Sequence, residues 1–281
     1  MDTRRLDGTT AIVTGASRGI GAALAGRLHA RGAAVVLVAR SAAPLDEVAH
    51  SLEDNEPTGA GVRTIVGDVT DPAVAERACQ TAVEEFGGLD LLVNNAGVSD
   101  HCDAPIWEVD GAAWWSTVAT NVLGPFLFSQ CAVRRMVASG AGGRIVNVGS
   151  IHAFRSGTTL TAYGVSKCAL ARLTEMLDAS LTGTGIHAFT YSPGPVRTAI
   201  FEGRTPSTAT PWVPMAEAVD GLLAIAHGEL DSLHGRFVHA RDDLDRLRDP
   251  WPGSSPARRV SLAAAFAGDP VAAMSGWTAS P

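Results

Sequence analysis

Short apolar stretches alternate along the chain with longer segments in which apolar and polar residues mix. The first apolar stretch covers residues 11–14, a helix-like segment covers 20–30, and a second apolar stretch covers 33–39. Together they have the size of one β–α–β unit, about thirty residues. Further apolar stretches lie at 64–66, 89–93, 144–148 and 187–191. Near-continuous apolar strands joined by helices predict a parallel sheet buried on both faces.

The two longest helical segments are predicted at 114–138 and 161–181, and each is followed by glycines. Residues 201–214 have loop composition and are interpreted as an insertion over a site, whereas 216–226 and 236–239 return to a helix and a strand. A linker is predicted at 250–256. The sequence therefore predicts an α/β fold with one domain over residues 1–249 and a C-terminal extension, 250–281, of unknown role.

Composition limits the kinds of partner. The formal net charge is −7 and there is no run of basic residues, which argues against a nucleic-acid-binding surface. No apolar run reaches the roughly 18 residues of a membrane span. The cysteines form no Cys-x-x-Cys pair and the histidines no cluster, so we expect no metal site. These features are typical of a cytoplasmic enzyme with reduced thiols that acts on a small molecule; the cysteines are Cys79, Cys102, Cys131 and Cys168.

A glycine-rich turn joins the first strand to the first helix, with the sequence TGASRGIG at 14–21. Gly15, Gly19 and Gly21 allow a sharp turn and a close approach to a pyrophosphate, which the amides at the helix start would bind. The spacing differs from the Gly-x-Gly-x-x-Gly of the dinucleotide fingerprint. A tight turn without a ligand is the alternative.

The end of the second strand bears on the choice of dinucleotide. NAD sites usually have an acidic residue there, but this chain has Ala39-Arg40-Ser41. Arg40 and Arg18 would suit the 2′-phosphate of NADP(H), because guanidinium groups bind phosphate well. NADP(H) is therefore favoured over NAD(H). The alternative is that both arginines are simply solvated.

Two more segments follow strands at the edge where open α/β sheets bind ligands. Asp68 and Val69 follow the third strand, and Asn94-Asn95-Ala96-Gly97 follows the fourth. Asp68 is predicted to accept from the adenine amino group, and the second turn to line the adenine ribose. Such a turn alone is more often only a turn.

Seven elements occur in an order that resembles the short-chain dehydrogenases/reductases, with a match over residues 7–243. They are TGASRGIG at 14–21, Asp68, NNAG at 94–97, Asn121, Ser150, YGVSK at 163–167 and Pro193-Gly194. The resemblance implies a Rossmann-type doubly wound sheet and hydride transfer between a nicotinamide and a small-molecule carbonyl or secondary alcohol. It also implies a homodimer or homotetramer, commonly formed through the helices that carry Asn121 and Tyr163.

The residue types fit this chemistry. Hydride addition to a carbonyl builds negative charge on oxygen, so a group must supply a proton. Tyr163 is the predicted donor, and Lys167, one turn along the same helix face, is expected to favour its ionised form. Ser150 is predicted to hydrogen-bond and orient the substrate oxygen.

Further roles come from the resemblance alone. Lys167 would bind the nicotinamide ribose, and Asn121 would hold a water between the lysine and solvent. The segment 193–198 would contact the nicotinamide amide and the pyrophosphate. The full set predicted to bind the cofactor is Gly15, Ser17, Arg18, Gly19, Ile20, Gly21, Arg40, Asp68, Val69, Asn95, Ala96, Gly97, Tyr163, Lys167, Pro193, Gly194, Val196 and Thr198.

The substrate is not specified, because loops near 98–108, 151–160 and 200–214 would determine it. Substrate contact is one interpretation of His152, and of His101 with Asp103, but histidines at strand ends are more often satisfied by local partners. Three tryptophans are expected in the core or at an interface rather than in a substrate wall: Trp107, Trp114 and Trp115. The alternatives for function are an NAD-linked dehydrogenase and a non-catalytic dinucleotide sensor.

Overall fold

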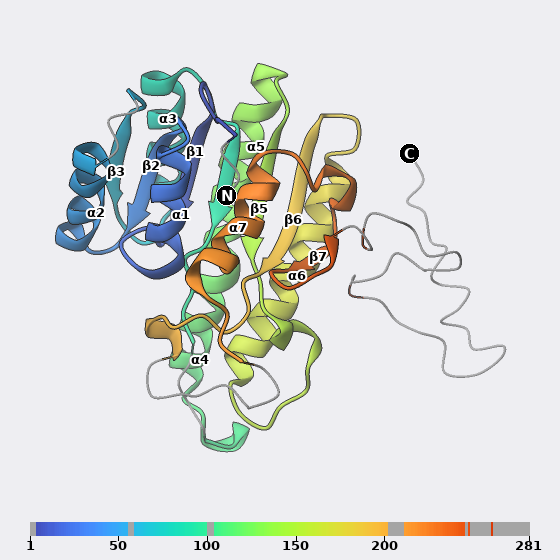
Figure 1. Cartoon of the computed structure of the whole chain (residues 1–281). Helices are drawn as coiled ribbons and strands as arrows, with labels where there is room; N and C mark the ends of the chain where they lie inside the picture. Colours follow the sequence, from blue (N-terminus) through green and yellow to red (C-terminus); the bar gives the residue numbers. More distant parts are fainter. Residues whose placement is uncertain are drawn as a thin grey trace.

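The computed structural model describes residues 4–55, 59–99, 104–201 and 211–244, together with Leu247 and Val260. Its strands form one parallel sheet in the order β3-β2-β1-β4-β5-β6-β7 (Figure 1). The strands are β1 (Thr10–Thr14), β2 (Ala34–Ala39), β3 (Val62–Val66), β4 (Leu91–Asn94), β5 (Gly143–Val148), β6 (Ile186–Ser192) and β7 (Phe237–His239). The strand order reverses between β1 and β4, which confirms the predicted doubly wound fold.

Helices cover both faces of the sheet (Figure 1). One face is covered by α1 (Gly19–His29), α2 (Ala42–Asn55) and α7 (Met215–Ala226), and the other by α3 (Pro72–Phe86), α5 (Gly124–Ser139) and α6 (Thr161–Ser180). Side chains of β1 alternate between the two cores: Val13 packs in the core of α1, and Ile12 in that of α3 and α5. Shorter helical segments are η1 (Ile106–Glu108), α4 (Gly111–Val118), η2 (Ala119–Leu123), η3 (Ile151–Phe154), η4 (Ala199–Phe201) and η5 (Asp231–Leu233).

A chain of buried polar side chains links the middle of the sheet to α5 and α6. Asn94 donates to Ser129 (3.1 Å) and to Asn147 (2.8 Å), Asn147 donates to Thr174 (2.9 Å), and Thr190 donates to Thr174 (2.8 Å). Each of these contacts satisfies a polar group that burial would otherwise leave unpaired. The network therefore fixes α6 against the strands that support it.

The helix predicted over 114–138 is helical throughout, but it is not one regular α-helix. The segment consists of α4, a π turn (η2) and α5. Pro125 has no amide hydrogen to donate to the carbonyl of Asn121 four residues earlier, and Gly124 lies close to the side chain of Val69. These local constraints favour a wider turn, which an apolar periodicity does not reveal.

Two of the three tryptophans are not in the core. The exposed fraction is 81% for Trp107 and 64% for Trp115, while Trp114 is half-buried. A core position is therefore wrong for Trp107 and Trp115, while the interface interpretation stays a prediction.

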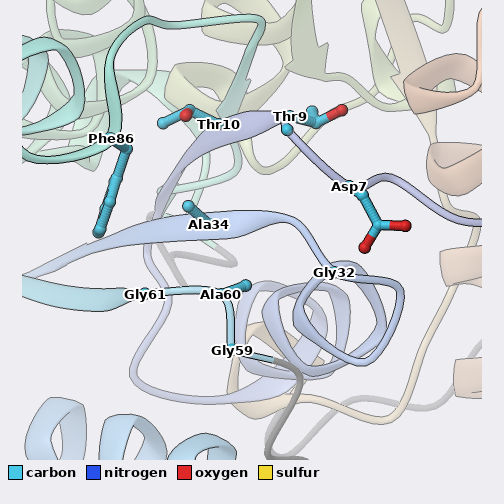
Figure 2. Close-up of a pocket in the computed structure, with 10 residues that line it drawn as sticks. Asp7, Thr9, Thr10, Gly32, Ala34, Gly59, Ala60, Gly61 and Phe86 are labelled. Atoms are coloured by element: carbon cyan, nitrogen blue, oxygen red, sulfur yellow. The ribbon is translucent and has the colours of Figure 1, made fainter.

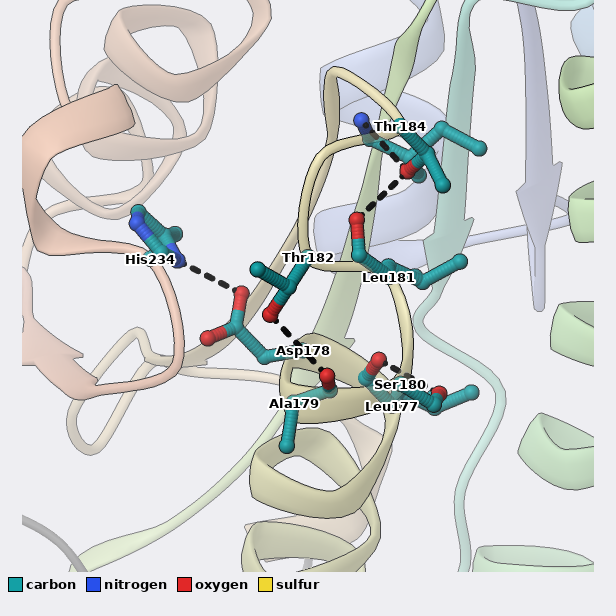
Figure 3. A network of polar contacts seen from close by, with 9 residues as sticks. Leu177, Asp178, Ala179, Ser180, Leu181, Thr182, Thr184 and His234 are labelled. Carbon is teal, nitrogen blue, oxygen red and sulfur yellow. Dashed lines mark hydrogen bonds and ion pairs between the residues drawn. The ribbon is translucent and has the colours of Figure 1, made fainter. Parts of the chain in front are cut away.

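The C-terminal end of α6 is tied to the segment that leads into β7 (Figure 3). The carboxylate of Asp178, only 8% exposed, lies 2.7 Å from Nδ1 of His234. The ring of His234 in turn packs on His187, with ring centroids 4.9 Å apart. These contacts anchor the far end of the helix whose first turn carries Tyr163.

An open cavity of about 320 Å³ lies at the amino ends of the first strands, lined by residues such as Asp7, Thr10, Ala34 and Phe86 (Figure 2). Thr10 and Ala34 begin β1 and β2, so the cavity is at the opposite end of the sheet from the predicted site. In the part of the chain that the structure describes, no helix is long and apolar enough to cross a membrane, and no three metal-ligating side chains gather. Cys79, Cys131 and Cys168 are free thiols, and the first two are neighbours across α3 and α5.

Candidate active site

Glycines at the turn between β1 and α1 allow two segments to touch. Gly15 and Gly19 have φ values of +65° and +60°, which favour glycine. A Cβ at Gly15 would lie 2.9 Å from Cα of Ala96, and one at Gly21 would lie 2.4 Å from the carbonyl oxygen of Gly15. Arg18, the N-cap residue of α1, makes no side-chain cap, so the first amides of the helix suit an anion. The turn therefore fits a dinucleotide pyrophosphate.

The turn after β4 is locked to the turn after β1. The side-chain amide of Asn95 donates to the carbonyl oxygens of Thr14 (2.9 Å) and Gly15 (3.2 Å). The hydroxyl of Thr14 accepts from the backbone amides of Asn95 and Ala96, both at 3.0 Å. These bonds hold the two predicted cofactor-binding turns side by side.

The segment after β6 borders the same place. A Cβ at Gly19 would lie 3.3 Å from Cγ2 of Thr198. Gly194 has a φ of +73°, and a Cβ there would lie 2.6 Å from Cγ2 of Val213 and 3.3 Å from Nε2 of His239. The structure thus brings Thr198, of the predicted segment after β6, beside the glycine turn.

Arg40 and Asp68 face each other across the ends of β2 and β3, with Nη1 of Arg40 4.0 Å from Oδ2 of Asp68. Oδ1 of Asp68 accepts from the amide and hydroxyl of Thr70, and these bonds help to hold the pKa of Asp68 below its usual range. Arg40 and Arg18 are both exposed. A cationic side chain therefore stands at the end of β2, where NAD sites usually have an acid.

Ser150 and Tyr163 meet at the carboxyl end of β5. Ser150 is the N-cap of η3, and its hydroxyl oxygen accepts from the backbone amide of His152 at 3.3 Å. The same oxygen lies 3.2 Å from Nδ1 of His152 and hydrogen-bonds the phenol of Tyr163. Burial raises the pKa of Tyr163, and the bond to Ser150 opposes that rise.

Lys167 is the sole lysine of the chain and is almost fully buried, with 4% of its surface exposed. Its Nζ donates to the carbonyl oxygen of Val148 at 2.7 Å and lies 5.6 Å from the centre of the Tyr163 ring. Burial lowers the pKa of Lys167 to about 8, because the charged form is poorly solvated.

Burial outweighs the expected effect of Lys167 on the pKa of Tyr163. We expected the ammonium group to lower the phenol's pKa, but burial dominates and raises it. The physical reason is the position of Nζ, which faces the aromatic ring and the carbonyl of Val148.

Asn121 is fully buried in the π turn. Its side chain accepts from the amide of Val98 and donates to the carbonyl of Val98 and to Ser166, each at 2.9 Å. A Cβ at Gly97 would lie 3.3 Å from Oδ1 of Asn121 and 3.5 Å from Nζ of Lys167. Asn121 therefore braces the turn after β4 against α6, while its predicted water contact stays a prediction.

Comparison with known proteins agrees with this geometry. The family model for short chain dehydrogenases matches residues 9–208. The chain belongs to the short-chain dehydrogenase family. A short-chain type dehydrogenase/reductase of Picea abies is 38% identical over 200 residues, which cover 70% of this chain and 73% of that protein. An uncharacterised oxidoreductase of Staphylococcus aureus (strain USA300) is 34% identical over 211 residues, covering 74% and 88%.

Solved structures of short-chain dehydrogenases have the same fold. A short-chain type dehydrogenase/reductase from Mycobacterium ulcerans superposes with a TM-score of 0.78 at 27% identity and covers 84% of this chain and 89% of its own. A gluconate 5-dehydrogenase from Burkholderia cenocepacia, solved in complex with NADP and tartrate, gives 0.75 at 28% identity and covers 84% and 94%. This chain is therefore an oxidoreductase, of a family that binds NAD(P) and acts on small molecules.

The structure places all the predicted catalytic and cofactor-binding residues within its described part. His101 and Asp103 lie outside the described residues. Two contributors were missed: Thr14, which joins the turns after β1 and β4, and Ser166, which links Asn121 to the carbonyl of Tyr163. Thr14 was marked only by its place at a strand end, and Ser166 by its spacing of three residues from Tyr163.

Proposed function

We propose that this short-chain dehydrogenase is NADP(H)-dependent and transfers a hydride between the nicotinamide and a small-molecule carbonyl or secondary alcohol, with Tyr163 as general acid and base. The observation that carries the proposal is the meeting of Tyr163, Ser150 and Lys167 beside a turn that fits a pyrophosphate.

In the direction of reduction, the nicotinamide supplies the hydride when it is bound. The electron pair of the hydride goes to the carbonyl carbon, and the carbonyl oxygen takes the proton of the Tyr163 hydroxyl. Ser150 donates a hydrogen bond to that oxygen and stabilises the charge that develops on it. Lys167, whose pKa of about 8 leaves it mostly protonated at neutral pH, places a positive charge beside the Tyr163 ring, and this charge would offset part of the rise that burial causes in the pKa of the phenol. Oxidation of the alcohol runs through the same groups in reverse.

Arg40 and Arg18 support NADP(H) as the cofactor. Both are exposed, and the ion pair that Arg40 forms within the described part of the chain is with Asp68, at 4.0 Å. An exposed pair at 4.0 Å is weak, so a phosphate would compete for the guanidinium group. The NADP complex of the gluconate 5-dehydrogenase is consistent with this choice.

The cofactor assignment predicts the effect of a double substitution. Ala39→Asp with Arg40→Leu should shift kcat/KM from NADP(H) toward NAD(H) by about tenfold or more, because a charge-assisted contact to the 2′-phosphate is lost. Arg27→Leu removes an arginine of α1 that pairs with Asp220 of α7; it is the matched control and should leave the ratio unchanged. An unaltered ratio in the double variant would remove Arg40 from the cofactor site.

The chemistry is tested with a panel of ketones, aldehydes and secondary alcohols and both dinucleotides. Tyr163→Phe should keep its affinity for NADPH and lose about a hundred- to ten-thousand-fold in turnover. Tyr191, the other tyrosine of the chain, bonds the carbonyl of Ala218, and Tyr191→Phe should retain turnover. Near-normal turnover by folded Tyr163→Phe would rule out the proposed acid.

Two alternatives are distinguished by the same panel. An NAD-linked dehydrogenase would show higher kcat/KM with NAD(H). A dinucleotide sensor would bind nucleotide tightly and turn over no compound; the retention of Tyr163 and Lys167 disfavours it.

We also propose a homo-oligomer assembled through α4, α5 and α6, in a reducing cytoplasm. Exposed apolar side chains on these helices support the assembly: Trp115, Phe126, Val165 and Met176. Light scattering coupled to gel filtration should give a dimer or tetramer, and Met176→Glu with Val165→Glu should lower the mass.

A further inference from the structure

The hydroxyl of Ser150 has more partners than it has hydrogens. Its oxygen accepts from the amide of His152 and also contacts Nδ1 of His152 (3.2 Å) and the phenol of Tyr163. A serine hydroxyl carries one hydrogen and can donate only one bond at a time. The single hydrogen is therefore directed either to the imidazole or to the side of Tyr163.

The protonation of Nδ1 decides between these two arrangements. If Nδ1 lacks a hydrogen, Ser150 donates to it, and the serine hydrogen points away from the reacting oxygen. If Nδ1 carries a hydrogen, His152 donates to Ser150, and the serine donates toward Tyr163. Only the second arrangement offers a donor where negative charge develops.

We propose that His152 is a positioning residue, whose Nδ1–H donates to Ser150 and turns the serine hydrogen toward Tyr163 and the substrate oxygen. The contacts of His152 with Ser150 and with the Tyr163 ring stand on the geometry alone, whereas their use in turnover rests on the proposed function.

The surroundings of the ring support this role. His152 is half-buried on η3, and its ring meets Tyr163 edge to face, with centroids 5.6 Å apart and planes at 70°. The rotamer is therefore held by packing as well as by Ser150. On α6, the titratable groups that face this cluster are Tyr163 itself and Lys167, which lies over the tyrosine ring.

The test measures the ionisation of Tyr163 without a substrate. The chain has two tyrosines, so a Tyr191→Phe background leaves Tyr163 as the only source of tyrosinate absorbance. Three proteins are titrated in that background, with native circular dichroism as the check on folding: the parent, His152→Phe and His152→Asn. Phenylalanine keeps the ring contact and removes both nitrogens, whereas asparagine places a non-titrating amide donor near the position of Nδ1.

The tyrosinate midpoint should rise by about half to one pH unit in His152→Phe, the size expected for one lost hydrogen bond in the chain. His152→Asn should restore the parent midpoint. In a Ser150→Ala background, His152→Phe should have no effect, because the imidazole acts through the serine. An unchanged midpoint in His152→Phe, or an equal rise with and without Ser150, would overturn the proposal.

Kinetics provide the second readout. With any carbonyl compound that the parent enzyme reduces, His152→Phe should lower kcat about tenfold at unchanged KM, and the loss should vanish in Ser150→Ala. A higher substrate KM that persists in Ser150→Ala would mean that His152 binds substrate directly, and would refute the positioning role. Failure of the proposed function gives a different result. The parent enzyme would then turn over no compound, whatever the tyrosinate midpoints of the three proteins are.

Discussion

Replacing Lys167 by methionine should stabilise the protein at neutral pH while abolishing its chemistry. Burial lowers the pKa of Lys167 from 10.5 to about 8, so the folded state binds this proton more weakly than the unfolded chain does. At about 1.36 kcal/mol per unit, this difference costs the folded protein about 3 kcal/mol at pH 7, where both states are protonated. Methionine has a similar length and no charge to bury.

The hydrogen bond that Lys167→Met removes reduces this gain in stability. Nζ of Lys167 donates to the carbonyl of Val148, and such a bond contributes about 1 kcal/mol. The net gain for Lys167→Met at pH 7 is therefore about 2 kcal/mol. Between pH 8 and 10.5 the folded lysine is neutral while the unfolded lysine is still charged, so the wild type gains stability relative to the variant as pH rises. The advantage of the variant should disappear by about pH 10.

The assay is urea unfolding of both proteins at pH 7, 8, 9 and 10, at one protomer concentration and without nucleotide. The difference between the two free energies is the observable, because groups other than Lys167 titrate in both proteins. Since Lys167 is the sole lysine, ¹³C-lysine labelling also gives one resonance whose titration midpoint should lie near pH 8. A midpoint near 10.5, or a stability difference that does not change with pH, would refute the reasoning.

Two further substitutions test the cofactor turn and the end of α6. Gly21→Ala should destabilise the protein by about 1–3 kcal/mol and abolish dinucleotide binding, because its Cβ would overlap the backbone of Gly15. Gly26→Ala is the control in the same helix: its Cβ would meet only Leu52, at 3.5 Å, and should stabilise the protein by up to about 1 kcal/mol. Equal effects of the two substitutions in thermal unfolding would contradict this packing argument. Asp178→Asn should lower the free energy of unfolding by about 1–2 kcal/mol, because the buried carboxylate bonds His234. Asp220→Asn is the control: its carboxylate lies equally close to Arg27, at 2.7 Å, but the pair is exposed, so the free energy of unfolding should change little. A larger loss for Asp220→Asn than for Asp178→Asn would count against the argument.

The sequence predicted the fold because the two patterns that carry it, apolar stretches and polar or glycine residues at strand ends, are both local. Apolar stretches marked the strands, and β1 and β2 begin within one residue of their predicted starts. Most predicted site residues follow strand ends, and parallel strands bring these ends to one edge of the sheet. The sequence alone therefore predicts that the turns around Gly15 and Asn95 lie at the same edge of the sheet.

Other features depend on contacts that local patterns do not encode. The burial of Asn121 follows from the π turn, which Pro125 and the approach of Gly124 to Val69 favour. The direction of Nζ in Lys167 follows from the carbonyl of Val148, on a different element. The exposure of Trp107 could not be read from its residue type, because aromatic residues occur in cores and at interfaces alike.

The π turn limits how this chain can change in length. One extra residue in that turn offsets α4 from α5 by about 100° around the helix axis. Deleting a single residue there would restore a regular helix, and either Asn121 would rotate away from Ser166 or Phe128 would rotate out of its core. A one-residue gap in an alignment of this stretch would therefore imply the loss of one of the two contacts. Natural relatives that keep both contacts must instead conserve the number of residues between Asn121 and Phe128, so spacing here is as diagnostic as residue identity.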